Sequence, residues 1–455
     1  MSNGSPLIQR NAHTVSVSRE ICRAIKENNI ELRRKYPFLF HQDCIGGMIF
    51  GGSILLISLF IYLYLSNYIS AISTTILIGI AISFLHELEH DIIHNLCFKQ
   101  QRWIQNFMFV FMWIAKLHVS PWFRRQEHLK HHLLSGQTND VEERLIGLGL
   151  KPNRKRMAVS MHPYGSVLVG DDVARDAQHF NLHGLLTTTA PAALVFLFIT
   201  RLFIAYNLLF MIYSYFNYDI VTIFGFHTFY PIIRTLAVCL TLPNLIRQSS
   251  LILMSNCCHY YGDIPLNNVY YQNQILDSWY VFPFQLFCFN FGATHIVHHY
   301  VPSQPFYIRH FTARAIKDMM INLGVRHNDF GILWRSNRYS VDPKEDNKQR
   351  FYGKCWFVVC LLLGVPLFIV WDVMVMHKLN KSILKLMKKK YSNSSLKEMD
   401  DSDDKAFSSD SNKFDSNDTV NNSALTNLNA LVNKIVLNDV SADQVDEISK
   451  TAVET

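Results

Sequence analysis

Charged residues are scarce in this chain of 455 residues. They make up 17% of it, against about 25% in an ordinary soluble domain. Apolar residues reach 49% and aromatic residues 13%. This shortage of charge argues against a wholly soluble protein and indicates an integral membrane protein.

Several short signals are also missing. Residues 1–40 contain no apolar stretch with a small-residue cleavage site, so we expect insertion to depend on internal apolar runs. The nine cysteines include no CxxC pair, which argues against a zinc ribbon or a redox motif and predicts reduced thiols. No haem-binding signature is visible in the terminal regions, so any electron donor is expected to be a separate protein.

The charges that are present are unevenly distributed. The whole chain carries +7 and residues 391–455 carry −8, so residues 1–390 carry +15. A basic body suits an anionic membrane surface or an acidic electron donor. The basic residues flank apolar runs and do not form one face, so no nucleic acid partner is expected.

Apolar runs set the predicted architecture. Residues 45–66 and 69–85 are each close to the roughly 20 residues that a span needs, and together they predict a helical hairpin. Residues 185–242 predict a second hairpin, although Arg201 interrupts it at a cost of at least ~2.5 kcal/mol at the bilayer centre. Residues 104–117 are too short to span and predict a surface or re-entrant helix.

A last apolar run, residues 355–376, has basic residues on both sides, so its orientation is undetermined. It either crosses the membrane or dips in and returns at Pro366. The fold class is therefore an all-α integral membrane protein with about four transmembrane helices in two hairpins and a helical cap. The predicted regions are a cytosolic N-terminal segment (1–45), a membrane domain (46–335), a C-terminal apolar helix with basic flanks (336–390) and a disordered acidic Asn/Ser-rich tail (391–455).

The stretch "HELEH" at residues 86–90 fits HExxH, in which two histidines bind zinc and Glu87 is the general base of a protease. It does not stand alone, because "HLKHH" and "HIVHH" occur at residues 128–132 and 295–299. Positions i, i+3 and i+4 share one helical face, so each cluster directs its imidazoles into one space. One zinc uses about four ligands, whereas these clusters fit two metals with four or five nitrogens each, as iron in oxygen chemistry requires.

HxxxH, HxxHH and HxxHH, in that order and with a hairpin before the third box, resemble the membrane fatty acid desaturase/hydroxylase superfamily over about residues 45–335. The resemblance implies a non-haem di-iron centre on the cytosolic side that uses O₂ and two electrons to oxidise an unactivated C–H bond of an acyl chain. It implies that the iron ligands are His86, His90, His128, His131, His132, His259, His295, His298 and His299. Glu87, His94, Asn256 and Asp263 are expected to stand around these ligands.

The resemblance also implies a lipid acyl substrate and an electron donor, either a b-type cytochrome or a ferredoxin with its reductase. Desaturation is the expected reaction; hydroxylation and terminal-alkene formation are alternatives that the boxes do not distinguish. A zinc protease leaves two histidine clusters unexplained. A metal transporter would place its ligands at mid-membrane, whereas these lie at the ends of apolar runs. The Asn/Ser-rich tail is typical of eukaryotic proteins and predicts the endoplasmic reticulum membrane.

Overall fold

The structure, a computed structural model, describes residues 12–177, 180–218, 225–364, 367–368 and 370–382. These residues form helices and two isolated β-bridges, with no strand. The α-helices are α1 (Ala12–Lys35), α2 (Gln42–Leu65), α3 (Ala71–Ile93), α4 (Arg102–Lys116), α5 (Pro121–Leu134), α6 (Val141–Leu145), α7 (Arg154–Met161), α8 (Gly170–Asp176), α9 (Leu182–Tyr215), α10 (Phe226–Leu236), α11 (Leu242–Cys258), α12 (Val269–Gln272), α13 (Phe282–Gln285), α14 (Phe291–Tyr300), α15 (Phe306–Asn322), α16 (Gly331–Trp334) and α17 (Asp346–Gly364).

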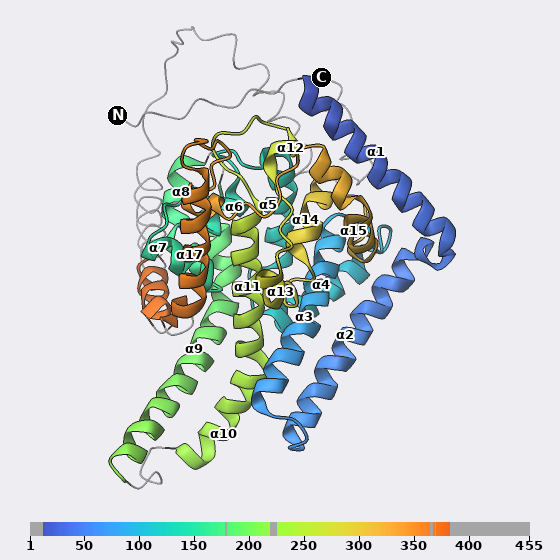
Figure 1. Ribbon diagram of the computed structural model, residues 1–455. Coiled ribbons are helices and arrows are strands. Elements are labelled where there is room, and N and C mark those ends of the chain that lie inside the picture. Colours follow the sequence, from blue (N-terminus) through green and yellow to red (C-terminus); the bar gives the residue numbers. More distant parts are fainter. Residues whose placement is uncertain (1–11, 178–179, 219–224, 365–366, 369, 383–455) are drawn as a thin grey trace, which may run out of the picture.

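Four helical segments of this part of the chain are long and apolar enough to cross a membrane: α2, α3, α9 and the continuous run Phe226–Cys258. That run joins α10 to α11 through a π-helical turn, η4 (Ala237–Thr241). In Figure 1 the helix pairs α2–α3 and α9–α10 both extend toward the lower end, while α5, α14 and α15 gather at the other end. The predicted fold class, with four spans in two hairpins and a helical cap, is confirmed.

Exposure along the spans shows which of them face lipid. Large side chains such as Leu55, Leu59 and Phe198 project outward from α2 and α9, as a bilayer solvent permits. By contrast, α3 buries one whole face from Thr74 to Ile93 and packs against both α2 and α11. The inner helices α3 and α11 therefore form the rigid base on which the cap is built.

Arg201, which interrupts the predicted second hairpin, has a partner from the far end of the sequence. Its Nε lies 2.6 Å from Oδ2 of Asp372, a buried residue of the segment 370–382. Pairing explains how α9 tolerates a cation within an apolar run. The predicted run 355–376 is not among the four candidate spans; α17 ends at Gly364, and Pro366 and the predicted tail 391–455 lie outside the described residues.

The cap helix α14 approaches the backbone of a preceding loop so closely that only glycine fits. The amide of Leu276 donates a hydrogen bond to the carbonyl of Gly292 (2.9 Å). A Cβ at Gly292 would lie 2.4 Å from the carbonyl oxygen of Leu276, well inside van der Waals contact. The position of α14, and of the histidines on it, therefore depends on the absence of a side chain here.

We predict that Gly292→Ala destabilises the protein by about 1–3 kcal/mol, because backbone must move to admit the methyl group. Thermal unfolding of the protein in detergent measures the effect as a lower Tm. Gly52→Ala is the matched control, since a Cβ at Gly52 on α2 meets nothing within 4 Å. Equal Tm values for the two variants would contradict this account of α14.

Candidate metal centre

Four elements of the cap-side end bring histidines together. Helix α3 carries His90 and ends at His94, one turn later. Helix α5 starts where Ser120 accepts a hydrogen bond from the amide of Phe123 and Pro121 takes the first helical position. The remaining histidines are His128, His131 and His132 on α5, His259 at the end of α11, and His295, His298 and His299 on α14.

Nine of these histidines form two separate groups, within which the candidate ligand atoms all lie within 4.8 Å of one another. The first group contains His90, His94, His128, His132 and His298, and the second contains His131, His259, His295 and His299. The inner ring nitrogens converge closely. Nε2 of His298 lies 2.8 Å from Nε2 of His132, and Nε2 of His295 lies 2.8 Å from Nε2 of His259. Two sites, one with five nitrogens and one with four, therefore lie side by side.

Acceptors behind the rings orient several of these nitrogens. Nδ1 of His128 lies 2.7 Å from Oε2 of Glu142, and Nδ1 of His131 lies 3.0 Å from Oδ2 of Asp140. Nδ1 of His299 lies 3.1 Å from the amide oxygen of Gln272. An Nδ1–H donated to a fixed acceptor leaves the lone pair on Nε2, which faces the group.

Burial decides the protonation of most rings. Burial, followed by repulsion from neighbouring imidazoles, holds the pKa of His132 and of His299 well below its usual range. His131 differs: burial alone would lower its pKa, but Asp140 outweighs it and the pKa rises to about 10. Burial also raises the pKa of Glu143 to about 8. Most of the converging imidazoles are thus neutral at neutral pH, which is the form that binds metals.

The structure brings eight of the nine predicted ligands into the two groups and leaves out His86. Nδ1 of His86 lies 3.4 Å from Nζ of Lys116, and its Nε2 lies 3.4 Å from Nη2 of Arg124. His94, expected to surround the ligands, lies within the first group, with Nε2 3.0 Å from Nε2 of His128. The helical turn His90–His94, and not His86–His90, thus faces the other boxes.

The other residues expected around the ligands lie farther from the two groups. A carboxylate oxygen of Glu87 lies 3.5 Å from Arg309, and Asn256 donates a hydrogen bond to the carbonyl of Ile146 (2.6 Å). Asp263 accepts hydrogen bonds from the amides of Tyr339 and Ser340 and so fixes a loop. These three residues support the surroundings and do not contact the converging nitrogens.

The carboxylates behind the rings were not predicted from the sequence. Asp140, Glu142 and Glu143 belong to the stretch "NDVEER", where Asp140 also caps α6 by accepting a hydrogen bond from the amide of Glu143 (3.4 Å). The only signal in the sequence is an acidic N-cap shortly after a histidine cluster. That signal is weak, because acidic caps are common at helix starts.

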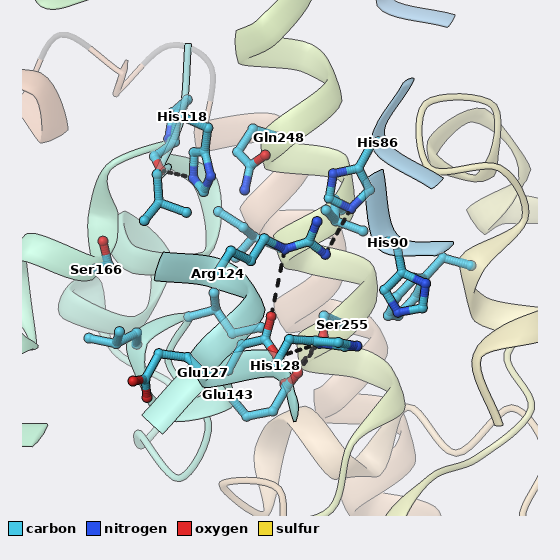
Figure 2. Close-up of a pocket in the computed structure, with 18 of the residues that line it drawn as sticks. His86, His90, His118, Arg124, Glu127, His128, Glu143, Ser166, Gln248 and Ser255 are labelled. Carbon is cyan, nitrogen blue, oxygen red and sulfur yellow. Dashed lines mark hydrogen bonds and ion pairs between the residues drawn. The ribbon is translucent and has the colours of Figure 1, made fainter. Parts of the chain in front are cut away.

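A cavity of about 140 Å³ adjoins the first group. Its polar wall includes His86, Arg124, Gln248 and Ser255, which Figure 2 shows around the same space as His90 and His128. Four glutamates, Glu87, Glu127, Glu142 and Glu143, and Arg309 also line it. Its apolar side chains are Val119, Phe123, Leu145, Ile146, Pro163, Leu185, Leu251, Ile252 and Phe291. A cavity with a mainly apolar wall beside converging imidazoles suits an apolar substrate.

Comparison with known proteins agrees with this geometry. The family model described as fatty acid desaturase matches residues 66–331, which is more than half of the chain and includes all three histidine boxes. A search of curated proteins finds no match to this chain. Together with the four apolar helices, this match makes the chain a multi-pass membrane oxidoreductase of lipids. The chain belongs to the fatty acid desaturase family.

Proposed function

We propose that this protein is an O₂-dependent di-iron oxidase of a lipid acyl chain and that it introduces a C=C bond. The observation that carries the proposal is the pair of adjacent histidine groups, with five and four candidate ligands. All nine donors are imidazoles, which suit iron, and they are too many for one zinc. A pair of irons bound there would supply O₂ activation for attack on an unactivated C–H bond.

The overall reaction balances without any group beyond the proposed partners. Two hydrogens of the acyl chain, two electrons and two protons reduce one O₂ to two waters, and the two carbons become a double bond. The electrons require a donor, which we propose to be a separate protein, a b-type cytochrome or a ferredoxin with its reductase. The basic body of the chain, +15 over residues 1–390, suits an acidic donor.

The protein's own residues have distinct parts in this proposal. Glu142, Asp140 and Gln272 hold rings so that their Nε2 atoms point inward. The apolar wall of the cavity excludes water and holds the chain against the first group. The buried carboxyl of Glu143 accepts a hydrogen bond from Ser255 (3.2 Å) and lies 3.3 Å from Nδ1 of His259, so it is placed to hold a proton beside the centre.

We also propose that the histidine end of the bundle faces the cytosol, in the endoplasmic reticulum membrane. The sequences between α2 and α3 (residues 66–70) and between α9 and α10 (residues 216–225) contain no lysine or arginine. At the histidine end, Arg33, Arg34 and Lys35 precede α2 by a few residues, and Lys99 follows α3. An excess of basic residues in short loops marks the cytosolic side.

The intramembrane protease is not supported by the geometry. It requires His86 and His90 to share one zinc, with Glu87 as the base. His86 lies in neither ligand group and instead contacts Lys116 and Arg124, while Glu87 pairs with Arg309.

Expression in a host followed by mass spectrometry of its lipids tests the reaction. We expect an acyl product that lacks two hydrogens, and we expect His128→Ala and His298→Ala to abolish it because each removes one ligand of the first group. His13→Ala, at an exposed position on α1, is the control and retains the product. A product that gains one oxygen would show that the reaction is hydroxylation and not desaturation. Full activity of either ligand variant would refute the metal assignment.

Two single substitutions on α3 distinguish the ligands. We predict that His94→Ala lowers bound iron from about two to about one per chain, since it removes a member of the five-nitrogen group. His86→Ala keeps about two, because His86 lies outside both groups. Iron is measured by elemental analysis of the purified protein. If His86→Ala lowered the bound iron and His94→Ala did not, His86 would be the ligand in place of His94.

Asp140→Asn tests the orientation of His131. The amide has no negative charge and only one acceptor oxygen, so it holds Nδ1–H less strongly than the carboxylate, and we expect the affinity for iron to fall by about 10- to 100-fold. Titration of the protein with a competing chelator measures this loss. Asp172→Asn, which removes only exposed pairs with Lys155 and Arg175, serves as the control. An unchanged affinity in Asp140→Asn would show that the centre does not need this carboxylate.

A further inference from the structure

The charged side chains that line the cavity beside the first histidine group already have partners. Arg124 lies 2.8 Å from Glu89 and 3.8 Å from Glu142. The other pairs are Arg309 with Glu87 (3.5 Å), Glu127 with Lys130 (3.2 Å) and Glu143 with the hydroxyl of Ser255 (3.2 Å). Among the described residues of the wall, no charged group is thus left over to hold a charged ligand, which favours an uncharged one.

One end of the cavity is polar but carries no charge. His118 and Gln248 both line the cavity. In Figure 2 they lie above Arg124, whereas Glu127 and Glu143 lie below it. We call the region of His118 and Gln248 the uncharged polar end, because its side chains can bind a ligand by hydrogen bonds and not by charge.

A buried threonine of α9 also lines the cavity, and its hydroxyl has no partner. Thr189 is 5% exposed, and its Oγ1 finds no hydrogen bond among the described residues. The preceding residue behaves differently, since the hydroxyl of Thr188 donates to the carbonyl of Gly184 at 2.7 Å. A buried hydroxyl without a hydrogen bond is costly and needs an explanation. A ligand in the cavity would supply the missing partner of Thr189.

Neighbouring groups fix the hydrogen-bonding roles of Gln248 and His118. The oxygen of Gln248 accepts from Nη2 of Arg247 (2.7 Å), so its amide nitrogen, a donor, is the end left for a ligand. Nε2 of His118 lies 3.2 Å from the carbonyl oxygen of Pro163, which can only accept, so Nε2 carries the hydrogen. Burial, with repulsion from Arg247, holds the pKa of His118 well below its usual range, so Nδ1 keeps its lone pair. The uncharged polar end therefore offers one donor and one acceptor, and the Thr189 hydroxyl can serve as either.

We propose that the cavity binds its substrate by an uncharged head that both accepts and donates hydrogen bonds, an amide or an alcohol, at Gln248, His118 and Thr189. The oxygen of such a head accepts from the amide nitrogen of Gln248, and its N–H or O–H donates to Nδ1 of His118. An ester or a thioester has no hydrogen to donate and would leave that nitrogen unmatched, which is how a polar site rejects an analogue. This inference rests on the proposed function and adds to it the class of acyl substrate.

Ligand binding to the full-length protein in detergent tests the inference without turnover. N-methylhexadecanamide and methyl hexadecanoate differ by an N–H in place of the ester oxygen. We expect the amide to bind at least about tenfold more tightly, as one buried hydrogen bond implies. The affinity is taken from the dependence of Tm on ligand concentration. Hexadecanol tests the alcohol, and the charged analogues hexadecanoate and hexadecylamine should bind no more tightly than the ester.

Two substitutions locate the head within the cavity. Thr189→Val removes the hydroxyl and keeps the shape, so it should weaken binding of the amide by at least about fivefold. It should not lower the Tm of the unliganded protein, because this hydroxyl has no partner among the described residues. Gln248→Glu keeps an acceptor for Arg247 but removes the donor, and it should weaken binding of the amide as well. Thr188→Val is the matched control and should bind the amide as the wild type does, since its hydroxyl serves only its own helix.

The outcomes separate this inference from the proposed function. Tighter binding of the amide or of the alcohol than of the ester supports the uncharged head and shows which of the two it is. Equal affinities for all three, no binding of amide and alcohol, or unchanged amide binding in both Thr189→Val and Gln248→Glu would overturn the inference while the oxidase remains. Tightest binding of hexadecanoate or hexadecylamine would also overturn it. Absence of oxidation with every substrate, in protein that contains iron and receives electrons, would overturn the proposed function itself.

Discussion

The hydrogen bond between the outer nitrogen of a buried imidazole and a fixed acceptor is the interaction on which the candidate centre depends. Nine imidazoles that converge would repel one another as cations, and burial keeps most of them neutral. A neutral ring still has two tautomers, of which only one presents its lone pair inward. Glu142 and Gln272 select that tautomer for His128 and His299, while Asp140, which raises the pKa of His131 to about 10, fixes the orientation of that ring. The helical scaffold serves to hold these acceptors behind the rings.

The bilayer imposes the second constraint. The spans α2 and α9 expose apolar side chains, so the cap depends on the two inner helices α3 and α11 for a rigid base. Both inner helices end in histidines, at His94 and His259. Where a charge does occur in a span, at Arg201, a buried carboxylate from beyond residue 366 neutralises it. The charge inside this span is therefore paired.

The sequence was sufficient to predict the fold class and most of the candidate site, because both depend on apolar runs and on histidines at helical spacing, which are visible in the sequence. Apolar runs of about 20 residues identified the four spans, and HxxHH identified six histidines through helical spacing. The choice between His86 and His94 could not be made this way, since "HELEHDIIH" contains two overlapping HxxxH pairs with the same spacing. Only the packing of α3 against α5 and α14 decides which pair faces the other boxes. The acceptors behind the rings escaped prediction because Asp140 only precedes a five-residue helix and Gln272 ends a four-residue helix, and such short helices show no repeating pattern in the sequence.

Asp140 belongs to two structures at once. One carboxylate receives the outer nitrogen of His131, the amide of Gly136 and the amide of Glu143 that starts α6. Helix α6 in turn supplies Glu142, Glu143 and Leu145 to the cavity wall. The candidate ligand His131 and the wall of the cavity therefore share one anchor. Orientation of His131 and formation of α6 are in this way coupled, so a change at Asp140 alters the histidine group and the cavity wall together.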